Sequence, residues 1–177
     1  MALFAITRGQ FSMIDAAMAC IDQVGECKIS LWTWTVAEYE VQCLERPYRD
    51  SRVKAADLII DHGARNKNMA IIRDFKSLFG PNSVRYVLNH SKICTIESAD
   101  FKLLLRGSMN LNHNPRFEQF DITEGGADFD LVKEIEQELD ILDDDCTGAQ
   151  VYKQSRVADA FDSEQLSFFK GIKVRAK

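Results

Sequence analysis

The alternation of two hydrophobic patterns constrains the fold of this chain more than any other feature. Short segments rich in β-branched and aromatic residues are typical of strands, and apolar residues repeated every three or four positions are typical of helices. The predicted strands are residues 3–7, 27–35, 55–61, 83–97, 101–110 and 117–125. The predicted helices are residues 12–24, 37–54 (interrupted by Pro47), 66–80 and 127–145, the last with an acidic, solvated face. This order predicts an α/β sandwich in which helices flank a mixed central sheet.

The length and charge of the chain limit its organisation. Its 177 residues suit a single domain with a sizeable core. We expect that core over about residues 3–145 and an extension over 146–177 that ends in a basic tail. The net charge of −5 argues against nonspecific binding of nucleic acid over the whole surface, but it is compatible with a local basic groove.

Cysteine usage and hydropathy predict a cytoplasmic protein. The five cysteines are scattered, odd in number and without CxxC pairs, which indicates reduced thiols rather than disulfides and gives no zinc site. The first residues, MALFAITRGQ, lack the pattern of a signal peptide, and no apolar run is long enough to span a membrane.

Four polar side chains with complementary chemistry occur on two consecutive predicted strands. His90 and Lys92 are two residues apart, so on a strand they share a face, and Ser108 and Asn110 share a face for the same reason. If the two strands form a hairpin, position 90 lies roughly opposite position 107 or 108. We therefore expect an imidazole, an ammonium, a hydroxyl and an amide to converge at the open end of this hairpin.

These groups suit a phosphate diester. An ammonium attracts a phosphoryl oxygen, and the hydroxyl and amide donate hydrogen bonds to it. Histidine can attack phosphorus or transfer protons near neutral pH. Gly107 lets the backbone approach a ligand closely, so it is a candidate substrate-binding position.

The two stretches resemble the motif of the phospholipase D superfamily, HxK-x4-D-x6-GSxN. Six residues separate Asp100 from Gly107, as in the motif, but seven separate it from Lys92. Four residues separate Glu97 from Lys92, as in the motif, but nine separate it from Gly107. A hairpin lengthened by three residues explains both counts and leaves the acidic position open between Asp100 and Glu97. The matching residues are His90, Lys92, Gly107, Ser108 and Asn110.

The resemblance implies a metal-independent phosphodiesterase that needs no cofactor. In the superfamily one histidine forms a phosphohistidine and a second protonates the leaving oxygen. This chain carries one motif, so the resemblance implies a homodimer with the site on its two-fold axis. It also implies an acidic residue that faces the site from the following strand, for which Glu118 is the candidate.

The short chain is most similar to the endonuclease branch of the superfamily, which implies a nucleic-acid substrate, DNA in preference to RNA. Arg65 and Lys67 follow the strand at 55–61 and are candidate substrate contacts, because strand ends form ligand sites in α/β sheets. The simplest explanation for both is that they are solvated loop charges. His62 and His113 are more simply structural histidines.

Three aromatic residues are candidates for stacking on bases, although core or interface positions also explain them. They are Trp32, Trp34 and Tyr86. Two alternative functions stay open: a non-catalytic module of the same fold that binds phosphate or nucleic acid, and a phospholipase or phosphatidyl transferase.

Overall fold

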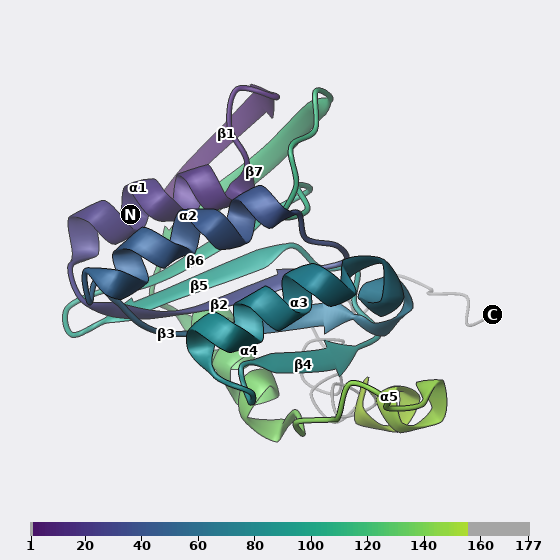
Figure 1. Ribbon diagram of the computed structural model, residues 1–177. Helices are drawn as coiled ribbons and strands as arrows, with labels where there is room; N and C mark the ends of the chain where they lie inside the picture. The colour runs from purple at the N-terminus through teal and green to yellow at the C-terminus, as the bar shows by residue number, and fades with distance from the viewer. Residues whose placement is uncertain (1, 156–177) are drawn as a thin grey trace, which may run out of the picture.

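The computed structural model describes residues 2–155 of the chain (Figure 1). Its centre is a seven-stranded mixed sheet with the order β1-β7-β6-β5-β2-β3-β4. The strands are β1 (Ala2–Arg8), β2 (Cys27–Thr33), β3 (Val53–Asp61), β4 (Val84–Val87), β5 (Ile93–Ser98), β6 (Lys102–Gly107) and β7 (Phe117–Glu124). The helices are α1 (Met13–Val24), α2 (Glu38–Arg49), α3 (Arg65–Phe79), α4 (Ala127–Glu138) and α5 (Gly148–Ser155), with a 3₁₀ turn η1 (His62–Ala64).

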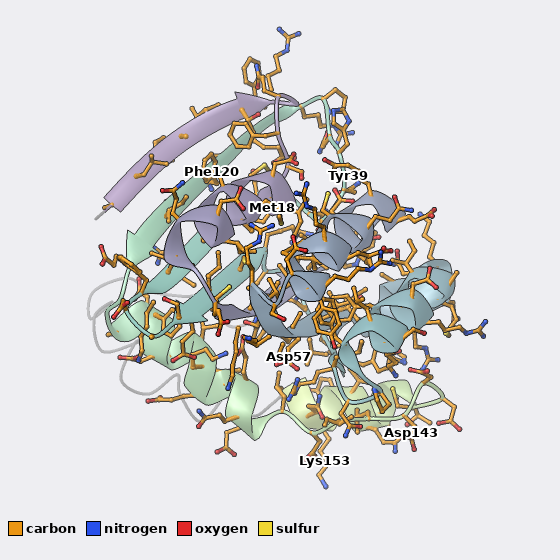
Figure 2. The ribbon with its side chains drawn as sticks, turned by 60° about the vertical axis from the view of Figure 1, so that its left-hand side comes forward. Met18, Tyr39, Asp57, Phe120, Asp143 and Lys153 are labelled. Carbon is orange, nitrogen blue, oxygen red and sulfur yellow. The ribbon has the colours of Figure 1, made fainter. Side chains whose placement is uncertain are left out.

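Helices cover both faces of the sheet. Figure 1 shows α1, α2 and α3 over one face and α4 behind the other. The first face buries the main core, which includes Leu31 of β2 and Phe120 of β7. Met18 of α1 packs against this core, and Figure 2 labels Phe120 and Met18. On the opposite face Leu104 of β6 packs against Phe129 of α4. The prediction of an α/β sandwich with a mixed central sheet and flanking helices is confirmed.

Strand direction gathers the functional positions at one end of the sheet. β2, β3 and β4 run parallel and are connected through α2 and α3, so their carboxyl ends lie on the same edge. β5, β6 and β7 form an antiparallel meander whose first strand pairs with β2. The start of β5 and the end of β6 therefore lie at the same edge as the end of β2.

The single strand predicted over residues 83–97 is wrong. β4 is an edge strand beside β3, whereas β5 lies in the middle of the sheet beside β2. Residues 88–92 connect the two strands across the end of β3. The buried side chain of Asn89 makes this crossing possible, since its amide donates to the carbonyl oxygen of Thr33 at 3.1 Å and its Oδ1 accepts from the N–H of Ser91 at 2.8 Å.

Several predicted boundaries also differ from the structure. α2 continues through Pro47 because the proline lies in its last turn. β6 ends at Gly107, three residues before the predicted end, and α4 ends at Glu138 rather than at residue 145. The acidic face of α4 is not all solvated, because Glu136 is 8% exposed and accepts hydrogen bonds from Ser30 and from the indole of Trp32.

The segment after α4 returns to the sheet at its β4 edge. Cys146 and Val151 belong to the main core, and the Gln154 amide donates to the carbonyl oxygen of Tyr86 at 3.0 Å. The predicted basic tail lies outside the described residues. In the part of the chain that the structure describes, no helix is both long and apolar enough to cross a membrane.

Candidate phosphate-binding site

A backbone hydrogen bond joins the two halves of the motif. The N–H of Gly107 donates to the carbonyl oxygen of Lys92 at 3.1 Å, directly beyond the last paired residues of β5 and β6, Ile93 and Arg106. In this register position 92 lies opposite 107, so the predicted pairing of 90 with 107 or 108 is displaced by one or two residues. His90, Lys92, Ser108 and Asn110 all lie outside the strands, so the strand-face reasoning does not apply to them.

His90 and Lys92 contact each other through their side chains. The Nζ atom of Lys92 lies 3.2 Å from Nδ1 of His90 and donates to the carbonyl oxygen of His90 at 2.5 Å. His90 is exposed, whereas Lys92 is only 7% exposed. Burial lowers the pKa of Lys92, and the nearby carboxylate of Glu118 opposes this shift. The ammonium is therefore partly desolvated, which strengthens its attraction to an anion.

Glu118 of β7 contacts Ser108 in the second half of the motif. Its carboxylate accepts hydrogen bonds from the Ser108 hydroxyl and, at 2.7 Å, from the side-chain amide of Asn114. The Ser108 hydroxyl also accepts from the N–H of Gln119 at 3.0 Å. Together with its electrostatic effect on Lys92, these contacts bring Glu118 next to both halves of the motif.

Two further residues at this end of the sheet, Thr33 and Asp61, were not identified by the sequence analysis. The hydroxyl of Thr33, at the end of β2, lies 3.5 Å from Oδ1 of Asn110 and accepts from the N–H of Leu111 at 3.2 Å. Asp61, at the end of β3, accepts from the N–H of Asn89 at 2.9 Å. The carboxyl ends of parallel strands are common ligand sites. The positions of Thr33 and Asp61 at the ends of β2 and β3 could therefore have identified them from the sequence.

Both candidates for the acidic motif position lie at the closed end of the hairpin. Glu97 pairs with Lys102, and Asp100 is exposed in the turn. Five residues of strand separate position 92 from 97, which corresponds to roughly 17 Å at about 3.3 Å per residue. Neither carboxylate therefore lies beside His90, and the added residues lengthen the hairpin at its tip.

The basic candidates after β3 have different environments. The Arg65 guanidinium donates to the carbonyl oxygen of Cys146 at 2.9 Å and lies over the Tyr86 ring, so it holds the 146 region against α3. Lys67 is exposed on α3. Nε2 of His62 also lies 3.1 Å from the Cys146 carbonyl oxygen, which agrees with a structural role.

The three aromatic candidates for stacking differ in their exposure and in their hydrogen bonds. Tyr86 is fully buried and donates its hydroxyl to Asp144. Trp32 donates its indole N–H to Glu136 at 2.8 Å. Trp34, one residue beyond β2, is 41% exposed. Within residues 2–155, no cluster of three or more His, Cys, Asp or Glu side chains has the arrangement of a metal site.

Solved structures with the same fold come from proteins of low sequence identity. No protein-family model and no curated protein matches the sequence. NucT from Helicobacter pylori is 12% identical and superposes with a TM-score of 0.58 over 78% of this chain and 96% of that chain. Polyphosphate kinase from Porphyromonas gingivalis is 16% identical, with a TM-score of 0.53 over 96% of this chain and 31% of that chain. Phosphatidylserine synthase from Haemophilus influenzae Rd KW20 is 11% identical, with a TM-score of 0.53 over 98% and 47% of the respective chains.

At these identities the likeness defines the fold alone. The chain has the phospholipase D-like α/β fold that the motif resemblance implied.

Proposed function

We propose that this protein is a metal-independent phosphodiesterase, and that it is an endonuclease acting on nucleic acid, DNA in preference to RNA. The observation that carries the proposal is the hydrogen bond from Gly107 N–H to the Lys92 carbonyl oxygen. It joins the segment of His90 to the segment of Ser108 and Asn110 at the end of the sheet where Thr33 and Asp61 also lie. An imidazole, a partly desolvated ammonium, a hydroxyl and an amide thus lie on two segments that adjoin at this end of the sheet.

The proposed reaction has two displacements at phosphorus. His90 attacks the phosphate, so that a P–N bond forms, the P–O bond breaks, and the leaving oxygen receives a proton from His90 of a second copy. Water then attacks the phosphohistidine, the second His90 accepts its proton, and the P–N bond breaks. Lys92 and Asn110 stabilise the charge on the non-bridging oxygens.

Through its contact with Nδ1 of His90, Lys92 also controls which nitrogen of the imidazole carries the proton. A neutral imidazole that accepts a hydrogen bond at Nδ1 carries its proton on Nε2, which leaves no lone pair on Nε2 for attack on phosphorus. When phosphate binds, the ammonium moves from Nδ1 to a phosphoryl oxygen. Nδ1 is then free to hold the proton, and Nε2 becomes available for attack.

A homodimer supplies the second histidine, because the chain carries one HxK and one GSxN motif. Subunit mixing tests this arrangement. If each site needs two copies of His90, increasing proportions of His90→Ala subunits reduce the activity as the square of the wild-type fraction, once subunits exchange. A linear decrease would contradict a shared site.

A non-catalytic phosphate-binding module is the second candidate. It is favoured by the contacts already made in the structure, since the Ser108 hydroxyl donates to Glu118 and Lys92 contacts His90. Rapid alkaline quenching with a phosphate-labelled oligonucleotide distinguishes the two functions, because the P–N bond of phosphohistidine is stable in alkali. The enzyme transfers label to the protein as an acid-labile phosphohistidine that is absent from His90→Ala, whereas a binding module binds the strand and acquires no label.

A further inference from the structure

We infer that Trp34 forms a nucleobase-binding position beside the phosphate site and gives the protein a preference for single-stranded nucleic acid. This inference rests on the proposed nucleic-acid substrate. It adds a contact that recognises the base, whereas the motif residues recognise the phosphate.

The register of the sheet brings position 34 next to the motif. Trp32 pairs with Ile93 at the end of the antiparallel ladder between β2 and β5. The next residue, Thr33, has its hydroxyl 3.5 Å from Oδ1 of the motif residue Asn110. The Asn89 side chain holds this arrangement, because its amide donates to the Thr33 carbonyl oxygen at 3.1 Å. Trp34 therefore directly follows a residue that contacts Asn89, in the segment of His90, and Asn110, in the second half of the motif.

The backbone on both sides of Trp34 is fixed while its side chain is exposed. Before it, the Thr33 hydroxyl donates to the Thr35 carbonyl oxygen at 2.7 Å. After it, the Thr35 hydroxyl donates to the buried Asn68 side chain at 3.2 Å, and Val36 forms a bridge with Leu111. A rigid backbone that presents a 41% exposed indole lowers the entropy lost when a ring stacks on it.

Trp32 gives an internal contrast. Its indole N–H donates to the buried carboxylate of Glu136, and its ring packs in the core between the sheet and α4. Its role is thus to hold α4. The chain has two tryptophans, so the exposed one can be observed separately.

Base stacking accounts for the proposed preference for single strands. In a duplex both faces of each base are covered by its neighbours, whereas an unstacked base offers a face to an aromatic side chain. An indole beside the phosphate site therefore binds a base of a single strand and leaves a duplex to backbone contacts alone.

Tryptophan fluorescence tests the inference directly. The variant Trp32→Phe, combined with His90→Ala to prevent cleavage, contains Trp34 as its only tryptophan. A short thymidine oligonucleotide is expected to quench its emission, and an abasic deoxyribose-phosphate strand of equal length is not. The matched variant Trp34→Phe, also combined with His90→Ala, retains Trp32 alone and is expected to show no quenching. If Trp32→Phe does not fold, quenching seen in His90→Ala and missing from the Trp34→Phe combination carries the same information.

Binding affinity gives a second, independent readout. Trp34→Ala is expected to bind the thymidine strand about tenfold more weakly, with unchanged affinity for the abasic strand. Equal affinity of Trp34→Ala and the parent for both strands would overturn the inference. The inference would also be overturned if Trp34 emission did not change with oligonucleotide but shifted when the protein was diluted. That result would show that the indole contacts a second copy of the chain.

The outcomes separate this inference from the proposed function. Base-dependent quenching without cleavage by the wild-type protein supports Trp34 and refutes the enzyme. Cleavage of the abasic strand without quenching by the thymidine strand supports the enzyme and refutes Trp34.

Discussion

The N–H of Gly107 lies 3.1 Å from the carbonyl oxygen of Lys92, and this hydrogen bond sets the geometry of the whole candidate site. It continues the β5–β6 ladder by one residue and fixes which residues after β6 face the His90 segment. A slip of one residue in this register would exchange the faces of the two strands. A change in the packing around Gly107 is therefore expected to displace the motif residues as well.

We predict that Gly107→Ala destabilises the protein. A Cβ atom at this position would lie 2.7 Å from the carbonyl oxygen of Gln119 and 3.1 Å from Cβ of Phe120, both in the neighbouring strand. Relieving these contacts requires strand displacement, which costs about 1–3 kcal/mol in well-packed regions. The measurement is the free energy of unfolding in urea, and phosphodiesterase activity should fall with it.

Gly148→Ala is the matched control, since a Cβ there would have no heavy atom within 4 Å in residues 2–155, apart from its chain neighbours and the backbone of its own helix. It should unfold like the wild type. Equal stability of the two variants would contradict the proposed packing at Gly107.

Glu118→Gln should change the pH dependence of activity. Burial lowers the pKa of Lys92, and the Glu118 carboxylate raises it in opposition. Removing the negative charge lowers the Lys92 pKa further, so the ammonium loses its proton at lower pH. The alkaline limb of kcat/KM against pH is expected to move toward acid.

Glu97→Gln serves as the control for this profile, because Glu97 pairs with Lys102 toward the closed end of the hairpin. Its alkaline limb should match that of the wild type. An unchanged pH profile in Glu118→Gln would show that the Glu118 carboxylate does not affect the pKa of Lys92.

Asn89→Ala should impair both stability and activity. The amide of Asn89 is 6% exposed and donates to the carbonyl oxygen of Thr33, while its own backbone N–H donates to Asp61. Truncation leaves buried carbonyl groups unsatisfied, at a cost of about 1–3 kcal/mol. It also loosens the segment that carries His90. Urea unfolding and cleavage assays measure the two effects, and Asn82→Ala, at an exposed position, should change neither.

The role of Asn89 also explains what the sequence could not predict. Residues 84–87 and 93–98 both have strand composition, and nothing local separates them into an edge strand and a central strand. The break depends on bonds from Asn89 to Thr33 and Asp61, which belong to two other strands. Such tertiary contacts leave no periodic signal in the sequence.

Where local rules suffice, the predictions agree with the structure. The helix predicted over residues 12–24 is α1, which a capping box starts through reciprocal bonds between Ser12 and Asp15. Of the residues that the motif spacing identified, His90 and Gly107 contact Lys92 in the structure. The burial of Glu136 was missed, because its partners Ser30 and Trp32 lie across the interface between α4 and the sheet.

Glu40→Gln is expected to stabilise the protein at neutral pH. Glu40 is 2% exposed, and neither carboxylate oxygen has a hydrogen-bond partner among the residues that the structure describes. Burial raises the pKa of Glu40 above its value in the unfolded chain, so folding favours the protonated form. The stability associated with Glu40 is therefore complete in acid and falls as pH rises through the unfolded pKa toward the folded one.

The glutamine variant does not titrate, so it should be more stable by about 1–3 kcal/mol at neutral pH, with the difference vanishing in acid. Urea unfolding at several pH values measures this. Glu38→Gln, at an exposed position of the same helix, should show no such pH-dependent gain. A constant difference between Glu40→Gln and wild type at all pH values would refute the ionisation effect.

The most direct test of the central claim is the cleavage of labelled single-stranded and double-stranded DNA and RNA in the presence of EDTA. The comparison is between wild type, His90→Ala and His113→Ala, because His113 is an exposed histidine whose Nε2 lies 3.3 Å from the Gly9 carbonyl oxygen. We expect chelator-resistant cutting by wild type and His113→Ala, and loss of this cutting in His90→Ala. Cutting that survives in His90→Ala, or that EDTA abolishes, would contradict it.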